Sequence, residues 1–253
     1  MKKFRDYNAE YYDAGENYAA DIPFYIQETL KTDEILEVGC GTGRVSFPLA
    51  KKALSLWGID ISDNMLTRAS SKITNRNANL KFSKADMFNL NLNKNFDLII
   101  APFRVVQCCE SEEQQQSLFK SIKEHLKPNG RCILNAFNPY LSKEDMGSKW
   151  LHDADEFDSK IILENGDLLV VFEERQKIST EKQILYTDLI SKRYREDKLI
   201  DTYINSIYMK YFYPDEFLSV IQKYGFEIIE KWGGYKSETY GQGNELVVSF
   251  KIS

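Results

Sequence analysis

The stretch of the sequence with the clearest chemical meaning contains three glycines at alternate positions. The segment Ile35–Arg44 runs from a short apolar stretch through Gly39, Gly41 and Gly43 into a helical pattern that continues to Ala50. A strand that turns tightly into a helix brings backbone N–H groups and the positive end of the helix against a ligand. Glycine suits this turn because only backbone then stands beside the ligand. The stretch therefore predicts a ligand-binding loop.

The spacing of the glycines separates two kinds of cofactor. Dinucleotide-binding turns have the pattern G-x-G-x-x-G, whereas the third glycine here comes one position early. Asp60 ends the next apolar segment and follows Gly39 by about 20 residues, the usual separation between a phosphate-type loop and a ribose-binding carboxylate. A carboxylate at the carboxyl end of a strand can accept both ribose hydroxyls. The spacing thus favours a nucleoside ligand, whether or not phosphate is present.

Two further segments place polar residues after strand-like runs. Asp86 and Met87 follow the alternating segment Leu80–Lys84. An acid there can bond to an adenine amino group while the methionine packs on the ring; the alternative is an aspartate that caps a turn. The segment Phe96–Ala101 is almost entirely apolar, as expected of a central parallel strand, and we expect the following residues, 102–107, to face a substrate.

Strands and helices alternate along most of the chain. Helical periodicity predicts helices over residues 63–74, after Ser62 as N-cap, and over residues 112–126, after Ser111 as N-cap. This alternation predicts an α/β fold with a doubly wound, mostly parallel sheet. Ligands of such sheets bind beyond the carboxyl ends of the strands. We therefore expect the glycine loop, Asp60, Asp86 and residues 102–104 to meet at one edge.

The pattern changes to antiparallel strands between about residues 160 and 210. The dipeptide Asn165-Gly166 between two apolar runs is typical of a hairpin turn. We expect residues 146–210 to form an inserted antiparallel sheet that is either a lid over the ligand or a dimer surface. Residues 1–145 and 211–253 are expected to form the α/β domain, with a helix over 214–224 and strands over 226–232 and 245–252.

The opening thirty residues are rich in tyrosine. Asp21 is the expected N-cap of a helix that has Pro23 in its first turn. This region either covers one edge of the sheet or acts as a lid in which Tyr11 or Tyr12 closes over a ligand, and both can hold together.

Composition argues against several other classes of protein. With 33 Lys and Arg against 38 Asp and Glu, the net charge is −5, which disfavours a nucleic-acid or anionic membrane surface. The four cysteines lack C-x-x-C spacing and there are two histidines, so we expect no metal site and reduced thiols. The start resembles no signal peptide, and no apolar run approaches the about 20 residues of a membrane span. We therefore expect a cytoplasmic protein with no membrane partner.

Taken in order, these segments resemble the class I S-adenosylmethionine-dependent methyltransferases. The resemblance rests on Ile35–Arg44, Gly58–Asp60, Ala85–Met87, Phe96–Ile99, Leu126–Gly130, Tyr213–Phe217 and Tyr224–Phe226. That family has a Rossmann-like sheet whose last strand is antiparallel. Three further segments are similar to a bacterial small-molecule-type subgroup with a β-sheet insertion after the fifth strand: Asp21–Tyr25, Phe103-Arg104 with Gln107, and Phe137–Pro139.

The resemblance implies S-adenosylmethionine as cofactor and assigns a role to each matching residue. Glu37 and the loop of Gly39, Cys40, Gly41 and Gly43 would hold the methionine part, Asp60 the ribose, and Asp86 with Met87 the adenine. Ala101 and Phe103 would lie beside the sulfonium. Arg44 either binds the cofactor carboxylate or supports packing. Tyr12, Ile61 and Met65 complete the implied cofactor contacts, although Met65 also suits a core position, and Arg104 and Tyr12 would orient the substrate.

The implied reaction transfers the sulfonium methyl to N, O or C of a small molecule. Because the donor is already activated, such an enzyme mainly needs alignment and exclusion of water. His125 suits a structural role, and His152 is a weak candidate for a base. An RNA or protein methyltransferase is the first alternative, and the acidic net charge disfavours it. Nucleic-acid amino-methyltransferases of this fold carry an Asp/Asn-Pro-Pro-Tyr/Phe turn, which residues 101–104 lack. A non-catalytic cofactor-binding protein is the second alternative, and the chain is expected to be a monomer or homodimer.

Overall fold

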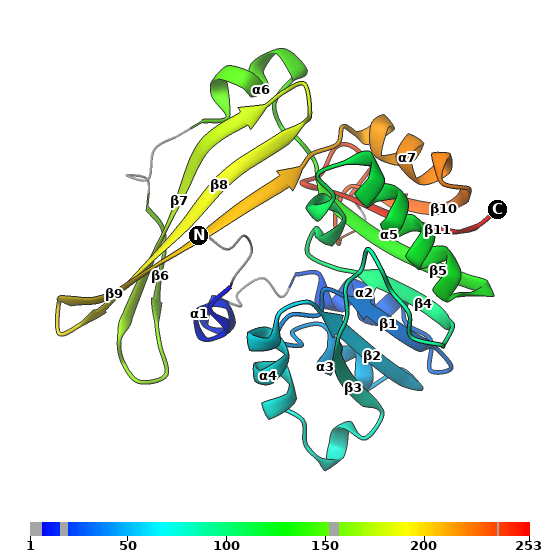
Figure 1. Cartoon of the computed structure of the whole chain (residues 1–253), viewed down its shortest axis with the longest axis horizontal. Coiled ribbons are helices and arrows are strands. Elements are labelled where there is room, and N and C mark those ends of the chain that lie inside the picture. The colour runs from blue at the N-terminus through cyan, green and yellow to red at the C-terminus, as the bar shows by residue number, and fades with distance from the viewer. Residues whose placement is uncertain (1–6, 16–19, 152–156, 237) are drawn as a thin grey trace. The chain divides into compact units, whose positions relative to one another are not determined.

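The structure is a computed structural model that describes residues 7–15, 20–151, 157–236 and 238–253 (Figure 1). These residues fold into two compact units. The antiparallel unit contains the described parts of residues 1–17 and 140–210, and the α/β unit contains those of residues 18–139 and 211–253. Within the described ranges, no helix is both long enough and apolar enough to cross a membrane.

The α/β unit is built on a seven-stranded sheet in the order β10-β11-β5-β4-β1-β2-β3. Its strands are β1 (Glu34–Val38), β2 (Ser55–Asp60), β3 (Leu80–Lys84), β4 (Phe96–Ala101), β5 (Leu126–Phe137), β10 (Phe226–Trp232) and β11 (Glu245–Ile252). Strands β1 to β5 pair in parallel, whereas β11 runs antiparallel to both β5 and β10. The predicted fold class, a mostly parallel sheet with an antiparallel last strand, is confirmed.

Helices cover both faces of this sheet. They are α2 (Ile22–Glu28), α3 (Ser46–Ala50), α4 (Asp63–Ser71), α5 (Glu112–His125) and α7 (Pro214–Lys223). One buried cluster contains Leu118 and Phe119 of α5 with Phe217 of α7, and a second contains Phe24 of α2 with Leu49 of α3. Both clusters also include side chains of β1 and β4, so these central strands are apolar on both faces, as the run of residues 96–101 predicts.

Serine caps begin two of the helices where the sequence predicts them. The Ser62 hydroxyl accepts the N–H of Met65 at 3.3 Å, and the Ser111 hydroxyl accepts that of Gln114 at 3.3 Å. Helix α4 ends at Ser71, earlier than predicted, because Thr74 caps a separate 3₁₀ turn.

Strand β5 begins at Leu126, the last residue of the helix predicted over residues 112–126. Leu126 pairs with Phe96, and the ladder resumes where Arg131 pairs with Leu98, so one strand continues across an irregular stretch. Pro128 and Gly130 lie within that stretch, and pairing with β4 on both sides keeps it in the sheet.

The antiparallel unit contains a four-stranded sheet in the order β6-β7-β8-β9. Its strands are β6 (Phe157–Ile162), β7 (Leu168–Ser179), β8 (Ile184–Arg195) and β9 (Lys198–Lys210), and its helices are α1 (Ala9–Ala14) and α6 (Lys143–Lys149). The predicted turn is confirmed, since the N–H of Leu163 donates to the carbonyl of Asp167 at 2.9 Å and Gly166 has a φ of +86°.

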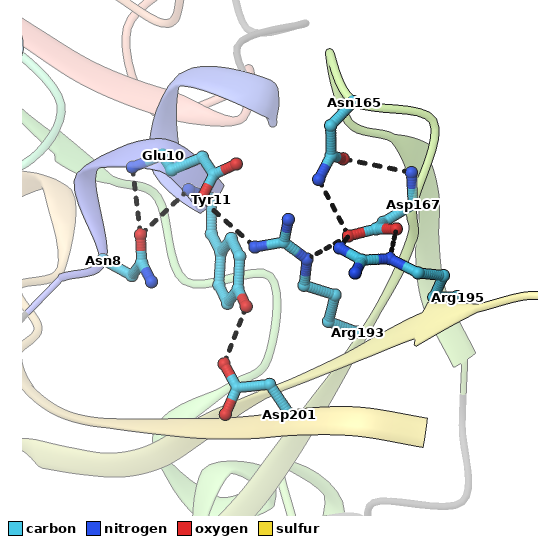
Figure 2. A network of polar contacts seen from close by, with 8 residues as sticks. All are labelled: Asn8, Glu10, Tyr11, Asn165, Asp167, Arg193, Arg195 and Asp201. Atoms are coloured by element: carbon cyan, nitrogen blue, oxygen red, sulfur yellow. Dashed lines mark hydrogen bonds and ion pairs between the residues drawn. The ribbon is translucent and has the colours of Figure 1, made fainter. Parts of the chain in front are cut away.

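Helix α1 packs on the antiparallel sheet, which differs from the predicted grouping of residues 1–145 with the α/β domain. Figure 2 shows the contacts: the Tyr11 hydroxyl donates to Asp201 of β9 at 2.8 Å, and Arg193 of β8 donates to Glu10 at 3.3 Å. The Tyr11 ring also meets that of Tyr203 edge-on at 6.3 Å between centroids. Local sequence could not predict this grouping, because the partners of α1 lie about 190 residues later.

Candidate functional site

The glycine loop leaves the carboxyl end of β1 in a conformation that needs its glycines. Gly39, Gly41 and Gly43 have φ values of +71°, +54° and +87°, which L side chains rarely adopt. A Cβ on Gly39 would lie 2.6 Å from Val105, and one on Gly43 would lie 2.7 Å from Phe47. Both the dihedral angles and the close neighbours therefore require glycine at these two positions.

Asp60 joins this loop to the end of β2. Its carboxylate accepts the N–H of Gly41 at 2.9 Å through one oxygen and the N–H of Ser62 at 2.9 Å through the other. The N–H of Cys40 donates to the carbonyl of Ile59 at 2.9 Å. The structure thus brings the loop and Asp60 together, as the sequence predicts, and each carboxylate oxygen retains a lone pair for a further donor.

Glu37 places a carboxyl group under the loop. Its side chain is buried and accepts a hydrogen bond from the Ser46 hydroxyl. Burial raises its pKa to about 8, against the opposing effects of the Ser46 hydrogen bond and the nearby Arg44. Near neutral pH this carboxyl group is therefore mostly protonated, and a cation placed beside it would favour its ionised form.

Arg44 forms a buried ion pair with Asp21. Two guanidinium nitrogens donate to the two carboxylate oxygens at 2.5 and 2.6 Å, and the guanidinium lies 5.5 Å from the ring centroid of Phe103. This geometry supports the packing role that was one of the two interpretations of Arg44. Asp21 is the N-cap residue of α2, as predicted, but its side chain makes no capping bond and is turned to Arg44 instead.

The turn after β4 is held in an unusual backbone conformation. Phe103 and Arg104 have φ values of +56° and +67°, in the left-handed region that is costly for non-glycine residues. The N–H of Arg104 donates to Asn135 at 3.1 Å, its guanidinium donates to Glu245 at 2.5 and 3.0 Å, and Asn135 also donates to Glu245 at 2.9 Å. Three strands, β4, β5 and β11, thereby fix this turn.

Sequence reasoning missed Asn135 and Glu245 as partners of Arg104. The one available signal was a polar Asn135 within the apolar run of β5, where a buried amide requires a partner. Beside the turn, Ala101 is buried, whereas Phe103 is 42% exposed.

The other predicted cofactor residues divide into exposed and buried groups. Asp86 is exposed and accepts the N–H of Phe88 at 2.9 Å, which is the turn-capping interpretation. Ile61 is 64% exposed next to Asp60, and Met87 is half-buried at the edge of the core. Met65 is buried, in agreement with the core interpretation.

Two buried hydroxyl groups in this unit were not predicted. Tyr25 of α2 is fully buried and its hydroxyl has no hydrogen-bond partner, and the hydroxyl of Thr42 in the glycine loop is also buried without one. Buried polar atoms normally find partners, so these two hydroxyls are available to a bound group.

The remaining candidates lie elsewhere. Tyr12 belongs to α1 in the antiparallel unit, where its ring meets that of Tyr7 edge-on, so its predicted contact with the cofactor stays a prediction. His125 is structural, as predicted: it is buried, its Nε2 accepts the N–H of Leu92 at 3.1 Å, and its Nδ1 lies 2.8 Å from the carbonyl of Ser121. His152 lies outside the described residues.

Comparison with protein families identifies the segment that carries the glycine loop. Residues 35–130 match the family model described as a methyltransferase domain. This segment is a methyltransferase domain. It contains the loop, Asp60, Asp86 and the turn after β4, which are the features predicted from the resemblance to class I methyltransferases.

Curated relatives match the region around this methyltransferase domain. A putative methyltransferase of Geobacillus sp. (strain WCH70) is 29% identical over 122 residues, which are 46% of this chain and 49% of the relative. A dTDP-3-amino-3,4,6-trideoxy-α-D-glucopyranose N,N-dimethyltransferase of Streptomyces venezuelae is 26% identical over 149 residues, 57% of this chain and 60% of the relative. The chain thus matches about half the length of the first of these relatives.

Solved structures share the fold over nearly the whole chain, insertion included. An S-adenosylmethionine-dependent methyltransferase from Clostridium acetobutylicum ATCC 824 has a TM-score of 0.77 at 18% identity and covers 96% of this chain and 94% of its own. DesVI of Streptomyces venezuelae has a TM-score of 0.71 at 17% identity, and the match covers 96% of this chain and 95% of the DesVI chain. These similarities show that the fold of this chain is known from other proteins.

Proposed function

We propose that the protein is an S-adenosylmethionine-dependent methyltransferase that acts on a small molecule. The observation that carries this proposal is the left-handed glycine loop, tied to Asp60, within a methyltransferase domain. The names of similar proteins support a small acceptor, since they include a sugar N-methyltransferase and an amino pentose methyltransferase. The acceptor atom is N, O or C, as expected from the sequence.

The residues of the α/β unit fit the cofactor. A Cβ at Gly39 or Gly43 would close the cradle that the loop forms, and the unpartnered hydroxyls of Thr42 and Tyr25 offer two buried polar contacts. In this proposal Glu37 and residues 39–43 hold the methionine part. The remaining residues of the proposed set are Asp60 and Ile61 for the ribose, Asp86 and Met87 for the adenine, Ala101 and Phe103 beside the sulfonium, and Met65 and Tyr12.

The chain's own side chains align the acceptor with the cofactor and exclude water from the reacting groups. When bound, the cofactor supplies a methyl group that its positive sulfur activates. The exposed ring of Phe103 gives the acceptor an apolar wall, and Arg104, held by Glu245 and still 37% exposed, offers a fixed cation for orientation. An amine acceptor needs only to lose its proton to solvent, so no dedicated base is required.

Titration calorimetry with S-adenosylhomocysteine tests this function. We expect micromolar binding to the wild type and at least about tenfold weaker binding to Asp60→Ala, because the carboxylate both supports the loop and accepts the ribose hydroxyls. Asp63→Ala is the matched control, since Asp63 is three residues later and exposed, with its side chain paired to Lys84. Absence of binding to the wild type would overturn the proposal.

Measurements of methyl transfer distinguish the proposed function from its two alternatives. Methyl transfer to polyanionic RNA or to a protein would favour the first alternative, and cofactor binding without turnover on any acceptor would favour a non-catalytic protein. A cytoplasmic location and a monomeric or homodimeric state remain predictions from the sequence.

A further inference from the structure

Two glutamates of β1 have opposite electrostatic surroundings. The Glu34 carboxylate, at the start of the strand, accepts from Lys94 at 2.6 Å and from Lys127 at 2.9 Å. Glu37 is 2% exposed, and within the described ranges its carboxyl group makes a hydrogen bond with the Ser46 hydroxyl and no ion pair. Burial without a cationic partner favours the neutral form of a carboxyl group. The strand therefore has an ionised glutamate at one end and a neutral one near the other.

The charged groups around Glu37 do not supply a counter-charge. The guanidinium of Arg44 donates to both carboxylate oxygens of Asp21, at 2.5 and 2.6 Å, so its positive charge is already matched. Asp60, whose carboxylate accepts the N–H of Gly41 at 2.9 Å, adds a further negative charge. An ionised Glu37 would thus be an excess negative charge in this buried cluster, and the partner that it lacks is a cationic group of a ligand.

The remaining neighbours of Glu37 carry no charge near neutral pH. In the sheet it pairs with Gly58 of β2 and Ile100 of β4. Tyr25 and Cys40 are titratable, but burial raises the pKa of both side chains well above their usual values, so both stay protonated. Burial raises the pKa of Glu37 only to about 8. Glu37 is therefore the group of this cluster that holds a proton at pH 7 and can release it near neutral pH.

We propose that binding of the cofactor is coupled to the release of one proton from Glu37, whose carboxylate then pairs with the α-ammonium group of the methionine part. The O–H bond of the carboxyl group breaks, its electron pair stays on the oxygen, and the proton passes to the buffer. The ammonium group of the ligand keeps its own protons. This inference rests on the proposed function, because it takes the ligand to be S-adenosylmethionine or S-adenosylhomocysteine, which share that ammonium group.

Proton release makes the affinity depend on pH in one direction. Below about pH 8 the free protein must give up the proton of Glu37 on binding, and this becomes easier as pH rises. The dissociation constant of S-adenosylhomocysteine should therefore fall about tenfold from pH 6 to pH 7, since one proton is released per ligand bound. A protein whose Glu37 stayed protonated on binding would show no such change.

Titration calorimetry in two buffers counts the protons that are released. S-adenosylhomocysteine is titrated into the whole chain at pH 7 in phosphate and in Tris, whose ionisation enthalpies differ, so the apparent binding enthalpies differ in proportion to the protons released. We expect about 0.9 proton per site for the wild type, which is the protonated fraction of Glu37 at pH 7 when its pKa is about 8. 5′-Methylthioadenosine, which lacks the amino-acid part of the ligand, should bind without proton release.

Two variants on β1 assign the proton to its residue. Glu37→Gln keeps an oxygen for the Ser46 hydroxyl but has no ionisable proton, so it should release none and should bind with the same affinity at pH 6 and pH 7. Glu34→Gln is the matched control on the same strand. Lys94 and Lys127 hold the pKa of Glu34 below its usual value, so this variant should release as many protons as the wild type.

The outcomes separate this inference from the proposed function. Equal binding enthalpies of S-adenosylhomocysteine in the two buffers would show that the wild type releases no proton. Release that persists in Glu37→Gln, or that is as large with 5′-methylthioadenosine, would assign the proton to another group. Each of these results overturns the inference while the proposed function stands. Failure of the wild type to bind S-adenosylhomocysteine would instead overturn the proposed function.

Discussion

Arg44 donates two hydrogen bonds, of 2.5 and 2.6 Å, to the carboxylate of Asp21, and the two side chains are only 7% and 5% exposed. This pair connects the residue after the last loop glycine with the residue before α2. A bidentate, buried pair of this kind fixes geometry, and its value to stability depends on both partners being present.

Removal of one partner of this pair should strongly lower the free energy of unfolding. Arg44→Met or Asp21→Leu leaves a buried charge without its partner, which typically costs about 3–5 kcal/mol. Urea unfolding measures the loss. The double variant should recover most of it, because no unpaired charge remains. Equal losses that simply add in the double variant would contradict a direct interaction.

The left-handed turn after β4 predicts an unusual order of stability at Arg104. Both Arg104→Gly and Arg104→Ala remove the bonds to Glu245, but glycine adopts a φ of +67° without strain. We expect Arg104→Gly to be about 1 kcal/mol more stable than Arg104→Ala, since the left-handed conformation costs an L residue about that much. Chemical unfolding of the two variants side by side tests this order. The opposite order, which is usual at helical or extended positions, would be inconsistent with the turn.

The raised pKa of Glu37 predicts a pH dependence of stability. Its pKa rises from 4.5 to about 8 on folding, so the folded state binds the proton more tightly than the unfolded state. The resulting stabilisation is complete below pH 4.5 and is lost as pH rises toward about 8, with a slope of at most about 1.4 kcal/mol per pH unit.

Glu37→Gln isolates this effect, because the amide oxygen still accepts the Ser46 hydroxyl but does not titrate. The free energy of unfolding of the wild type, measured across that pH range, should fall relative to that of the variant as pH rises. Parallel pH profiles would show that Glu37 titrates alike in the folded and unfolded states.

Contacts of Tyr11 should govern local opening of α1. Tyr11→Phe removes the 2.8 Å bond to Asp201 (Figure 2). It keeps the ring against Tyr203. We expect a loss of about 0.5–1.5 kcal/mol in protection of the α1 amides from hydrogen exchange, with amides of the α/β unit unaffected. Tyr194→Phe on β8 is the control, and a similar change there would show that the effect is not specific to the Tyr11 bond.

The sequence by itself determined the features that depend on local pattern. Glycines at positions 39, 41 and 43 and an acid at position 60 predict a loop and a carboxylate at adjacent strand ends, because backbone conformation and strand periodicity are encoded over a few residues. The order of apolar segments likewise predicts a doubly wound sheet and an antiparallel insertion, since each strand type has its own hydrophobic pattern.

Tertiary structure alone decided which distant side chains meet. It paired Arg104 with Glu245, which is 141 residues later, paired Lys127 with Glu34, and assigned α1 to the antiparallel sheet. Nothing in the spacing of these residues predicts such contacts. A side chain's hydrogen-bond partner depends on which strands become neighbours and in what register, and that is fixed only when the whole chain packs.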